Sequence, residues 1–225
     1  MERTSIIERI KIKLDEFTPV DEGVSHPLDS YIQPTLSDAI PELIRNAPFQ
    51  KLPPEDVELY EKNDDGDITG TIIDFEQPSG FDADPACIVT FPHDIVQVAS
   101  IRFPEWSRPV FNFVDPLSPV AGMQYVRATR GGLSKPVVVL DRGGSEKEGF
   151  FVARCFSHPE IEKNEDGSFK EEPEIKVLHL KKPEEIDDFL IEALVLLTAS
   201  KVMAAIQNFE VSKVLYEQYT NNLMQ

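Results

Sequence analysis

The chain has 225 residues, of which 41% are apolar, so it can bury a core in one or two domains. Its net charge of −18 reflects 40 acidic and 22 basic residues spread along the chain, and a surface of this sign repels phosphate and disfavours tight DNA binding. The longest apolar run, residues 193–197, is too short to cross a bilayer, and the N-terminus lacks the apolar core of a signal peptide. We therefore expect a soluble, non-secreted protein, in which Cys87 and Cys155 are reduced, buried thiols.

Two helical segments open the chain. Thr4 or Ser5 can cap the first, in which apolar residues recur at helical spacing: Ile7, Ile10, Leu14 and Phe17. The second keeps that spacing from residue 28 to residue 44 but contains Pro34 and Pro41. Because an interior proline removes a hydrogen bond and costs about 3 kcal/mol, we expect a kink or several short helices there.

The middle of the chain has the alternation of β-strands. Strands are expected at residues 57–61, 68–75, 86–91, 95–103, 110–114, 136–140, 150–156 and 174–180. Turn residues at 63–67 and 141–145 predict hairpins, and Pro116 with Pro119 predicts a loop. The pattern indicates a β meander or a small barrel-like β part.

Residues 183–208 form the clearest predicted helix. Pro183 suits a first turn, and four acidic residues follow where the helix dipole is positive. Two apolar lines run along it, Ile186, Leu190, Ala193, Leu197 and Ala204 in one, Phe189, Leu196 and Met203 in the other. So wide a stripe predicts cover from more than one side. A bend at Gln207 and Asn208 would precede a last, more polar helix carrying Val211, Val214, Leu215, Gln218 and Leu223.

These elements predict an α+β fold. Helices of residues 1–50 and 183–225 would pack in one layer, with a β domain of residues 51–182 inserted between them, because each apolar face needs a neighbouring layer.

Known catalytic and metal-binding patterns are not found in the sequence. The acidic turn at residues 61–68 resembles the start of a calcium loop, but its twelfth position is Ile72, which favours an ordinary hairpin turn. The histidines share no metal-binding spacing: His26, His93, His158 and His179. We therefore expect no enzyme activity, no cofactor and no metal.

Two arginine-containing stretches need an interpretation. Residues 130–132 and 142–144 both read Arg-Gly-Gly, which favours tight turns with positive φ over anion-binding nests. Trp106 stands beside Arg102 and Arg108, with too few further basic residues for a nucleic-acid platform. Core packing or a protein interface remain as the two interpretations of Trp106.

The order of parts resembles a known family. The stretches that carry the resemblance are residues 28–32 (LDSYI), 91–101 (FPHDIVQVASI), 106–110 (WSRPV), 129–132 (TRGG) with 135–137 (KPV), and 183–186 (PEEI) leading into 194–199 (LVLLTA). They are similar to the tail-tubular-protein-A-like head-to-tail adaptors of short-tailed phages, and more closely to ring proteins of crAss-like phages of gut Bacteroides. Pro41 departs from the regular helical layer of that family.

The resemblance implies a virion structural protein without catalysis, made in the host bacterial cytoplasm. Twelve subunits would close a ring next to the portal protein and further tail rings, and DNA would pass through its channel without specific binding. An acidic wall suits such passage. Hypothetical interface residues are Trp106, Arg108, Arg130, Val211 and Leu215.

Residues 209–225 have a thin apolar face, so we expect this helix to find its partner on the portal or on a neighbouring subunit, with docking on its own domain as the alternative. Two rival functions stay open. One is a monomeric receptor- or carbohydrate-binding module, marked by exposed aromatic residues on loops. The other is an enzyme with an acidic site, marked by two carboxylates of perturbed pKa in one cleft.

Overall fold

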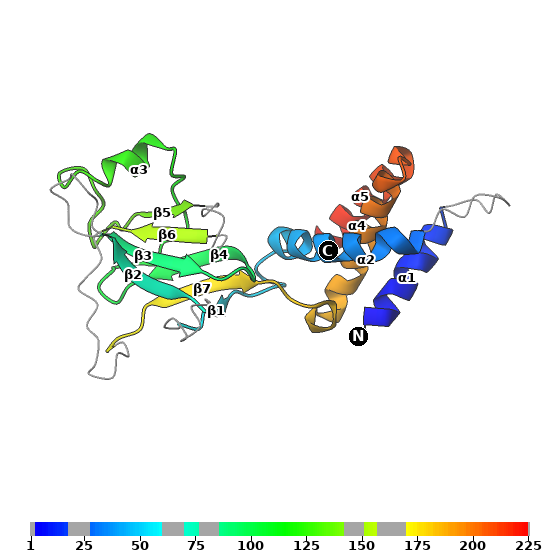
Figure 1. The fold of residues 1–225 in the computed structure, drawn as a ribbon, viewed down its shortest axis with the longest axis horizontal. Helices are drawn as coiled ribbons and strands as arrows, with labels where there is room; N and C mark the ends of the chain where they lie inside the picture. Colours follow the sequence, from blue (N-terminus) through cyan, green and yellow to red (C-terminus); the bar gives the residue numbers. More distant parts are fainter. Residues whose placement is uncertain are drawn as a thin grey trace. The chain divides into compact units, whose positions relative to one another are not determined.

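The chain divides into two compact units (Figure 1). The structure is a computed structural model that describes residues 3–17, 28–59, 70–76, 86–141, 151–156 and 170–224. A helical unit comprises Met1–Pro53 and Leu180–Gln225, and a β unit comprises Pro54–His179. Helices and antiparallel sheets are both present, which confirms the predicted α+β class.

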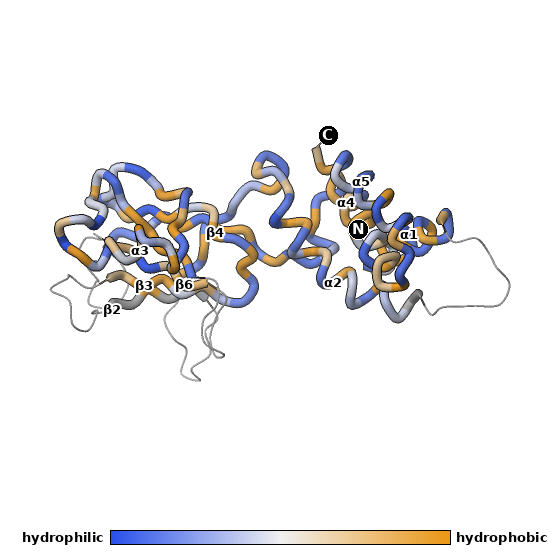
Figure 2. The backbone as a smooth tube through the Cα atoms, turned by 90° about the horizontal axis from the view of Figure 1, so that it is seen from above, coloured by the Kyte–Doolittle hydropathy of each residue, from blue (hydrophilic) through white to orange (hydrophobic). Residues whose placement is uncertain are grey.

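The helical unit is built around α4 (Asp188–Ala205), against which α1 (Arg3–Asp15), α2 (Leu28–Asn46) and α5 (Phe209–Met224) all pack. Between Leu190 and Met203 nearly every α4 side chain is buried, as the wide apolar stripe predicted. In Figure 2 the hydrophobic colour accordingly follows α4. The exceptions, Glu192 and Lys201, form ion pairs with Arg9 of α1 and Glu42 of α2, and the Lys201–Glu42 distance is 2.7 Å.

Residues 183–208 are not one continuous helix. Pro183–Glu185 forms a separate 3-10 turn, η1, whose Glu185 carboxylate accepts a hydrogen bond from the N–H of Lys182 at 3.5 Å. Ile186 and Asp187 are extended, with ψ of 132° and 140°, so α4 begins only at Asp188. The turn closes before Ile186, and Ile186 buries its side chain while its backbone is extended. This extended stretch separates η1 from α4. Phe189, which the apolar spacing placed in the core, is 51% exposed.

The two N-terminal helices depart from their predicted form. The buried stripe of α1 is Ile6, Ile10 and Leu14, so Ile6 takes the place expected for Ile7. The α2 segment is a single helix of 19 residues that includes both prolines, and the expected short helices are wrong. Packing against α4 outweighs the lost backbone hydrogen bonds, since α2 buries a long apolar stripe that includes Ile32, Leu36, Ala39, Leu43 and Ile44.

The corner between α4 and α5 confirms the predicted bend. Gln207 has a φ of 66°, and its N–H donates to Ala204 O at 3.0 Å, while Asn208 N–H donates to Met203 O at 2.9 Å. This pair of bonds is the Schellman end of a helix. The Asn208 side chain then caps α5 by accepting from Val211 N–H at 3.4 Å.

The β unit holds two antiparallel sheets in its described part. One has the order β1-β7-β4 and the other β2-β3-β6-β5. The strands are β1 (Glu55–Asp56), β2 (Ile72–Glu76), β3 (Ala86–Phe91), β4 (Ile95–Arg102), β5 (Val138–Asp141), β6 (Phe151–Cys155) and β7 (Glu174–His179). Both sheets contribute to one apolar core, for example Val89, Phe91 and Ala153 from one sheet and Ile101 and Val177 from the other.

The strand order is not that of a meander, because the chain changes sheet between β3 and β4 and because β7 returns to pair with β4. The hairpin expected between residues 57–61 and 68–75 is also wrong: β1 pairs with β7, β2 pairs with β3, and Leu59 and Thr71 form a parallel bridge. Its turn at residues 63–67 lies outside the described residues. The expected pairing of residues 136–140 with 150–156 is confirmed by β5 and β6.

Candidate functional site

Three of the five hypothetical interface residues lie on one long connection, residues 103–137, between β4 and β5. This segment, called the connection below, was expected to contain a strand at residues 110–114. It forms only isolated bridges there, Val110 with Ile101 and Val114 with Val139. Its conformation is therefore set by contacts other than a sheet ladder.

Trp106 anchors the start of the connection in the β core. The side chain is 1% exposed and meets the Phe103 ring edge to face, with ring centroids 4.9 Å apart. Its backbone N–H donates to Phe103 O at 2.9 Å. Core packing is thus the correct interpretation of Trp106, and the interface hypothesis for this residue is wrong because the ring cannot reach another molecule.

Side-chain hydrogen bonds hold the rest of the connection in shape. The hydroxyl of Ser107 donates to Ser134 O at 3.0 Å, so the two ends of the connection lie side by side. The buried Gln124 accepts from Gly131 N–H at 2.8 Å and donates to Val120 O at 3.0 Å. These bonds satisfy backbone groups that would otherwise need a sheet or helix partner.

Gly131 has a steric role rather than the expected turn role. A Cβ at this position would lie 2.6 Å from Lys135 O and 2.8 Å from Val137 Cγ2. Neither Gly131 nor Gly132 has a φ in the left-handed region, so the expectation of positive φ is wrong here. Close approach of two backbone segments explains the glycine. The second Arg-Gly-Gly stretch, residues 142–144, lies outside the described residues.

A short helix, α3 (Pro119–Met123), lies where Pro116 and Pro119 predicted a loop. Ser118 is its N-cap and accepts a hydrogen bond from Val120 N–H at 3.2 Å. Pro119 occupies the first helical position, where proline costs nothing because that N–H has no intrahelical partner. Ala121 is buried on the inner side of α3, whereas Val120 and Met123 are exposed.

The exposed side chains of the connection are largely apolar or basic, and we call them together the exposed face. Fifteen large apolar side chains are exposed in the described ranges, and six of them lie on the connection: Phe111, Leu117, Val120, Met123, Val126 and Leu133. Leu117, at 95%, is the most exposed of the fifteen. Four basic residues, Arg108, Arg127, Arg130 and Lys135, outnumber Glu105 and Asp115, so the connection carries +2 in a chain of net charge −18.

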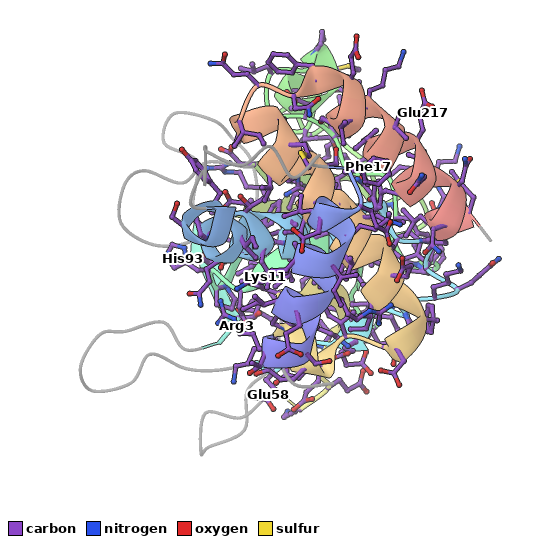
Figure 3. All side chains as sticks on the ribbon, turned by 90° about the vertical axis from the view of Figure 1, so that its right-hand side faces the viewer. Arg3, Lys11, Phe17, Glu58, His93 and Glu217 are labelled. Atoms are coloured by element: carbon purple, nitrogen blue, oxygen red, sulfur yellow. The ribbon has the colours of Figure 1, made fainter. Side chains whose placement is uncertain are left out.

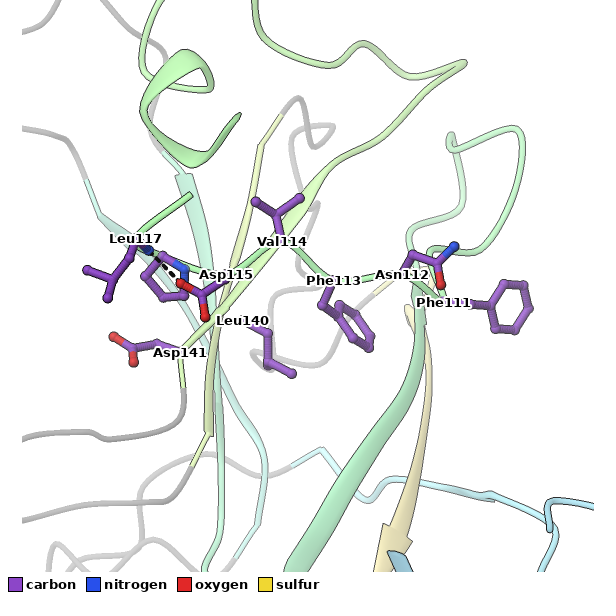
Figure 4. A pocket seen from close by; sticks show the side chains of 9 residues that line it. Phe111, Asn112, Phe113, Val114, Asp115, Leu117, Leu140 and Asp141 are labelled. Atoms are coloured by element: carbon purple, nitrogen blue, oxygen red, sulfur yellow. Dashed lines mark hydrogen bonds between the residues drawn. The ribbon is translucent and has the colours of Figure 1, made fainter. Parts of the chain in front are cut away.

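A groove of about 740 Å³ runs beside this face (Figure 4). It is lined by residues 111–117 together with Leu140 and Asp141 of β5. Asp115 Oδ1 accepts a hydrogen bond from Leu117 N–H at 2.8 Å, which is drawn as a dashed line in Figure 4. The bond fixes the turn from which the Leu117 side chain projects.

The other two hypothetical interface residues belong to α5 in the helical unit. Leu215 is fully buried, and α5 packs on α4 through Leu215, Tyr219 and Leu223. The Ser200 hydroxyl adds a 2.8 Å bond to Ser212 O. The apolar face of α5 is wider than the sequence pattern predicted, because Tyr219 completes it. The helix packs on its own unit, which was the alternative expectation. Val211 is half-buried. Figure 3 shows Glu217 on the outer side of α5, away from α4.

Few of the described residues form groups that could bind a metal or take part in catalysis. Within those ranges, no cluster of three or more His, Cys, Asp or Glu side chains could hold a metal ion. His179 lies 3.6 Å from Asp94, whereas His26, His158 and the acidic turn at residues 61–68 fall outside the described ranges. None of the helices that the structure describes is long and apolar enough to span a membrane.

The exposed face was missed by sequence reasoning apart from Arg108 and Arg130. A signal was present, because Pro116-Leu117 and Pro119-Val120 place apolar residues next to prolines, within a stretch of net positive charge. A scan against models of protein families gives no match, and a search of the curated proteins gives none either. The fold and this surface define an α+β protein with an inserted two-sheet β unit and a candidate protein interface.

Proposed function

We propose that this chain is a ring-forming structural protein of a phage virion, a head-to-tail adaptor that lies next to the portal and extends the DNA channel of a short-tailed phage. The observation that carries the proposal is the exposed face of the connection, which contributes exposed apolar and basic side chains to a chain of net charge −18. Such a surface is suited to a subunit contact, because apolar, arginine-containing patches are enriched at interfaces.

The architecture adds support of a second kind. Both ends of the chain fold into one helical unit, the β unit is a single insertion, and α4 follows it in the chain, as the adaptor's helix follows its β part. In this proposal, about twelve subunits meet through two different surfaces and close around an axis, as heterologous contacts do when their rotation closes. The virion neck is the corresponding location, with the portal and further tail rings as partners.

DNA would pass through the channel without specific binding. With 40 acidic against 22 basic residues, the protein repels the phosphate backbone. The isolated protein should therefore show negligible affinity for duplex DNA at physiological salt. Tight binding that weakens steeply with added salt would contradict this part of the proposal, since such a slope reports neutralised phosphates.

The test of the proposed function is the native mass of the pure protein. The monomer has a mass of 25.4 kDa, and a ring would give a single species of about twelve times that mass together with annular particles in electron micrographs. The measurement is made by light scattering after size exclusion, over a range of protein concentrations. A monomer at every concentration would count against the adaptor.

A monomeric binding module is the second candidate function. One observation favours it: Phe111, on the rim of the groove, is 65% exposed, and exposed aromatic residues on loops are the mark of such modules. If the groove holds a receptor or a carbohydrate, Phe111→Ala should abolish binding on a glycan array or to bacterial cells. The same substitution would leave the monomer's mass and folding unchanged.

A further inference from the structure

We propose that the exposed face of the connection docks on an acidic groove beside β1 of a second copy of this chain. The inference rests on the proposed function and adds to it the two surfaces through which neighbouring subunits would meet. It is argued from the shape, the charge and the placement of those surfaces.

The exposed face has the apolar content of an interface core. Its six exposed apolar side chains occupy a connection of 35 residues, and the groove beside it can receive side chains of a partner. On a monomer these six side chains would keep apolar area in water. The free-energy cost of that exposure is about 25 cal/mol per Å² of apolar surface. Docking on another protein removes that area from water.

The face is also held in one conformation before binding. Bonds from the side chains of Ser107, Asp115 and Gln124 fix its turns, and Trp106 anchors it in the core. A preformed surface loses little side-chain and loop entropy on association, so more of the contact energy appears as affinity.

The charge of the face points to a second copy as the occupant. Arg108, Arg127 and Lys135 are exposed on the connection, which carries +2. The remainder of the chain has 18 basic and 38 acidic residues, so any other copy presents mainly negative surface to this face. Complementary charge of this kind steers encounter and sets the register of a contact.

A particular acidic surface lies on the same unit. Four carboxylates, from Glu55, Asp56, Glu58 and Asp94, line a groove of about 280 Å³ at the β1 edge of the three-stranded sheet. Lys176 pairs with Asp56 at 3.2 Å, His179 lies 3.6 Å from Asp94, and Glu55 and Glu58 also have partners; the groove lining itself contains four carboxylates and one basic side chain, His179. The groove is therefore negative where the exposed face is positive.

The two surfaces are placed for a contact that repeats around an axis. Figure 1 shows α3 and β1 at opposite sides of the β unit. A face on one side can then meet the groove of the next copy while its own groove stays free for a third copy. Heterologous pairing of this kind produces a ring or a filament, whereas a self-complementary patch would stop at a dimer.

The experiment measures association of the full chain by sedimentation velocity over a concentration series, at low and high salt. Three variants probe the contact: Leu117→Asp and Arg127→Glu on the exposed face and Asp56→Lys in the groove. Two matched controls carry the same kinds of change on α1, Ile12→Asp at a side chain that is 62% exposed and Arg3→Glu at an exposed arginine. Thermal unfolding of each variant checks that the fold is kept, as expected for exposed positions.

We expect each of the three variants to weaken association by about tenfold or more, as loss of a central contact does, with the controls within about twofold of the wild type. High salt should weaken the wild-type contact, and Arg127→Glu combined with Asp56→Lys should recover part of the loss. Unchanged association of Leu117→Asp or of Asp56→Lys would overturn the inference.

The outcomes separate this inference from the proposed function. A closed ring that persists in all three variants overturns the docking surfaces and leaves the adaptor standing. A wild-type filament that the variants abolish supports the docking surfaces and overturns the ring, whereas a wild-type assembly that stops at a dimer overturns the heterologous contact. A wild type that stays monomeric overturns both.

Discussion

Cys87 and Cys155 face each other across β3 and β6, and both thiols are fully buried and not joined in a disulfide. Burial raises the pKa of the Cys155 thiol well above its ordinary value, and the neighbouring Cys87 raises it further. The expectation of reduced, buried thiols is confirmed. The two cysteines are 68 positions apart in the sequence, so the sequence alone does not show that they are neighbours in one sheet.

Neither thiol should react with a thiol reagent in the folded protein. The thiolate is the reactive form, and burial both disfavours it and blocks access. We expect almost no release of chromophore from Ellman's reagent under native conditions and two equivalents per chain in denaturant, in line with the two cysteines of the sequence. Rapid labelling of the native protein would show that the β3–β6 pairing opens readily.

Leu197→Ala should destabilise the helical unit by roughly 2 to 5 kcal/mol, because Leu197 is fully buried in α4 and its truncation leaves a cavity. Phe189→Ala is the matched control on the same helix. Phe189 is half-exposed, with the Lys51 ammonium 5.8 Å from its ring centroid, so its loss should cost under about 1 kcal/mol. Urea unfolding followed by circular dichroism measures both, and equal costs would contradict the burial of α4.

Trp106→Ala should cost about 3 to 5 kcal/mol, since the ring is buried and packs edge to face on Phe103. Phe111→Ala, at an exposed aromatic residue of the same connection, should change stability by less than about half a kcal/mol. Thermal unfolding of the two variants distinguishes them. A neutral Trp106→Ala would mean that the anchor of the connection lies elsewhere.

Gln207→Gly should stabilise the corner between α4 and α5 by about 0.5 to 1 kcal/mol. Gln207 has a φ of 66°, a region in which a side chain is strained and glycine is not. Gln207→Val should destabilise, because a β-branched residue tolerates this region worst. Unfolding midpoints in urea give the sign of each change, and a loss of stability in the glycine variant would exclude strain at this residue.

Tyr219→Phe should lower stability at pH 7 by about 0.5 to 1.5 kcal/mol, because it removes the hydrogen bond from Asn46 Nδ2 to the phenol oxygen at 3.3 Å. The pKa of Tyr219 is raised, mainly by burial, with Glu42 and Tyr216 adding to the effect and Asn46 opposing it. The folded state therefore keeps the phenol proton of Tyr219. The contribution of this group to the free energy of unfolding is present below the unfolded pKa of about 10 and is lost as the pH rises through the folded pKa.

It follows that the stability difference between wild type and Tyr219→Phe should shrink above about pH 10, where only the wild type has a phenol to ionise. Urea unfolding of both proteins between neutral and alkaline pH measures this difference. A gap that stays constant over the alkaline range would contradict the raised pKa.

Local patterns in the sequence determined the α+β class, the identity of most elements and the burial of the central helix. The stripe around Leu194 and Leu197 is wide enough to require cover on several sides whatever covers it, and the alternation in residues 86–91 and 95–102 indicates strands whatever their neighbours are. These signals are local, because side-chain periodicity follows from the backbone geometry of a single element.

Only the tertiary structure decided which strands pair, where Trp106 and Phe189 lie, and which surface is exposed. Alternation shows that a strand has an apolar face but not which strand lies beside it, so the pairing of β3 with β6 and β4 with β7 could not be predicted. The prolines of α2 stay in one helix because packing on α4 outweighs their local cost. The turn that carries Leu117 is held locally by the bond to Asp115, but only the tertiary structure leaves the Leu117 side chain 95% exposed.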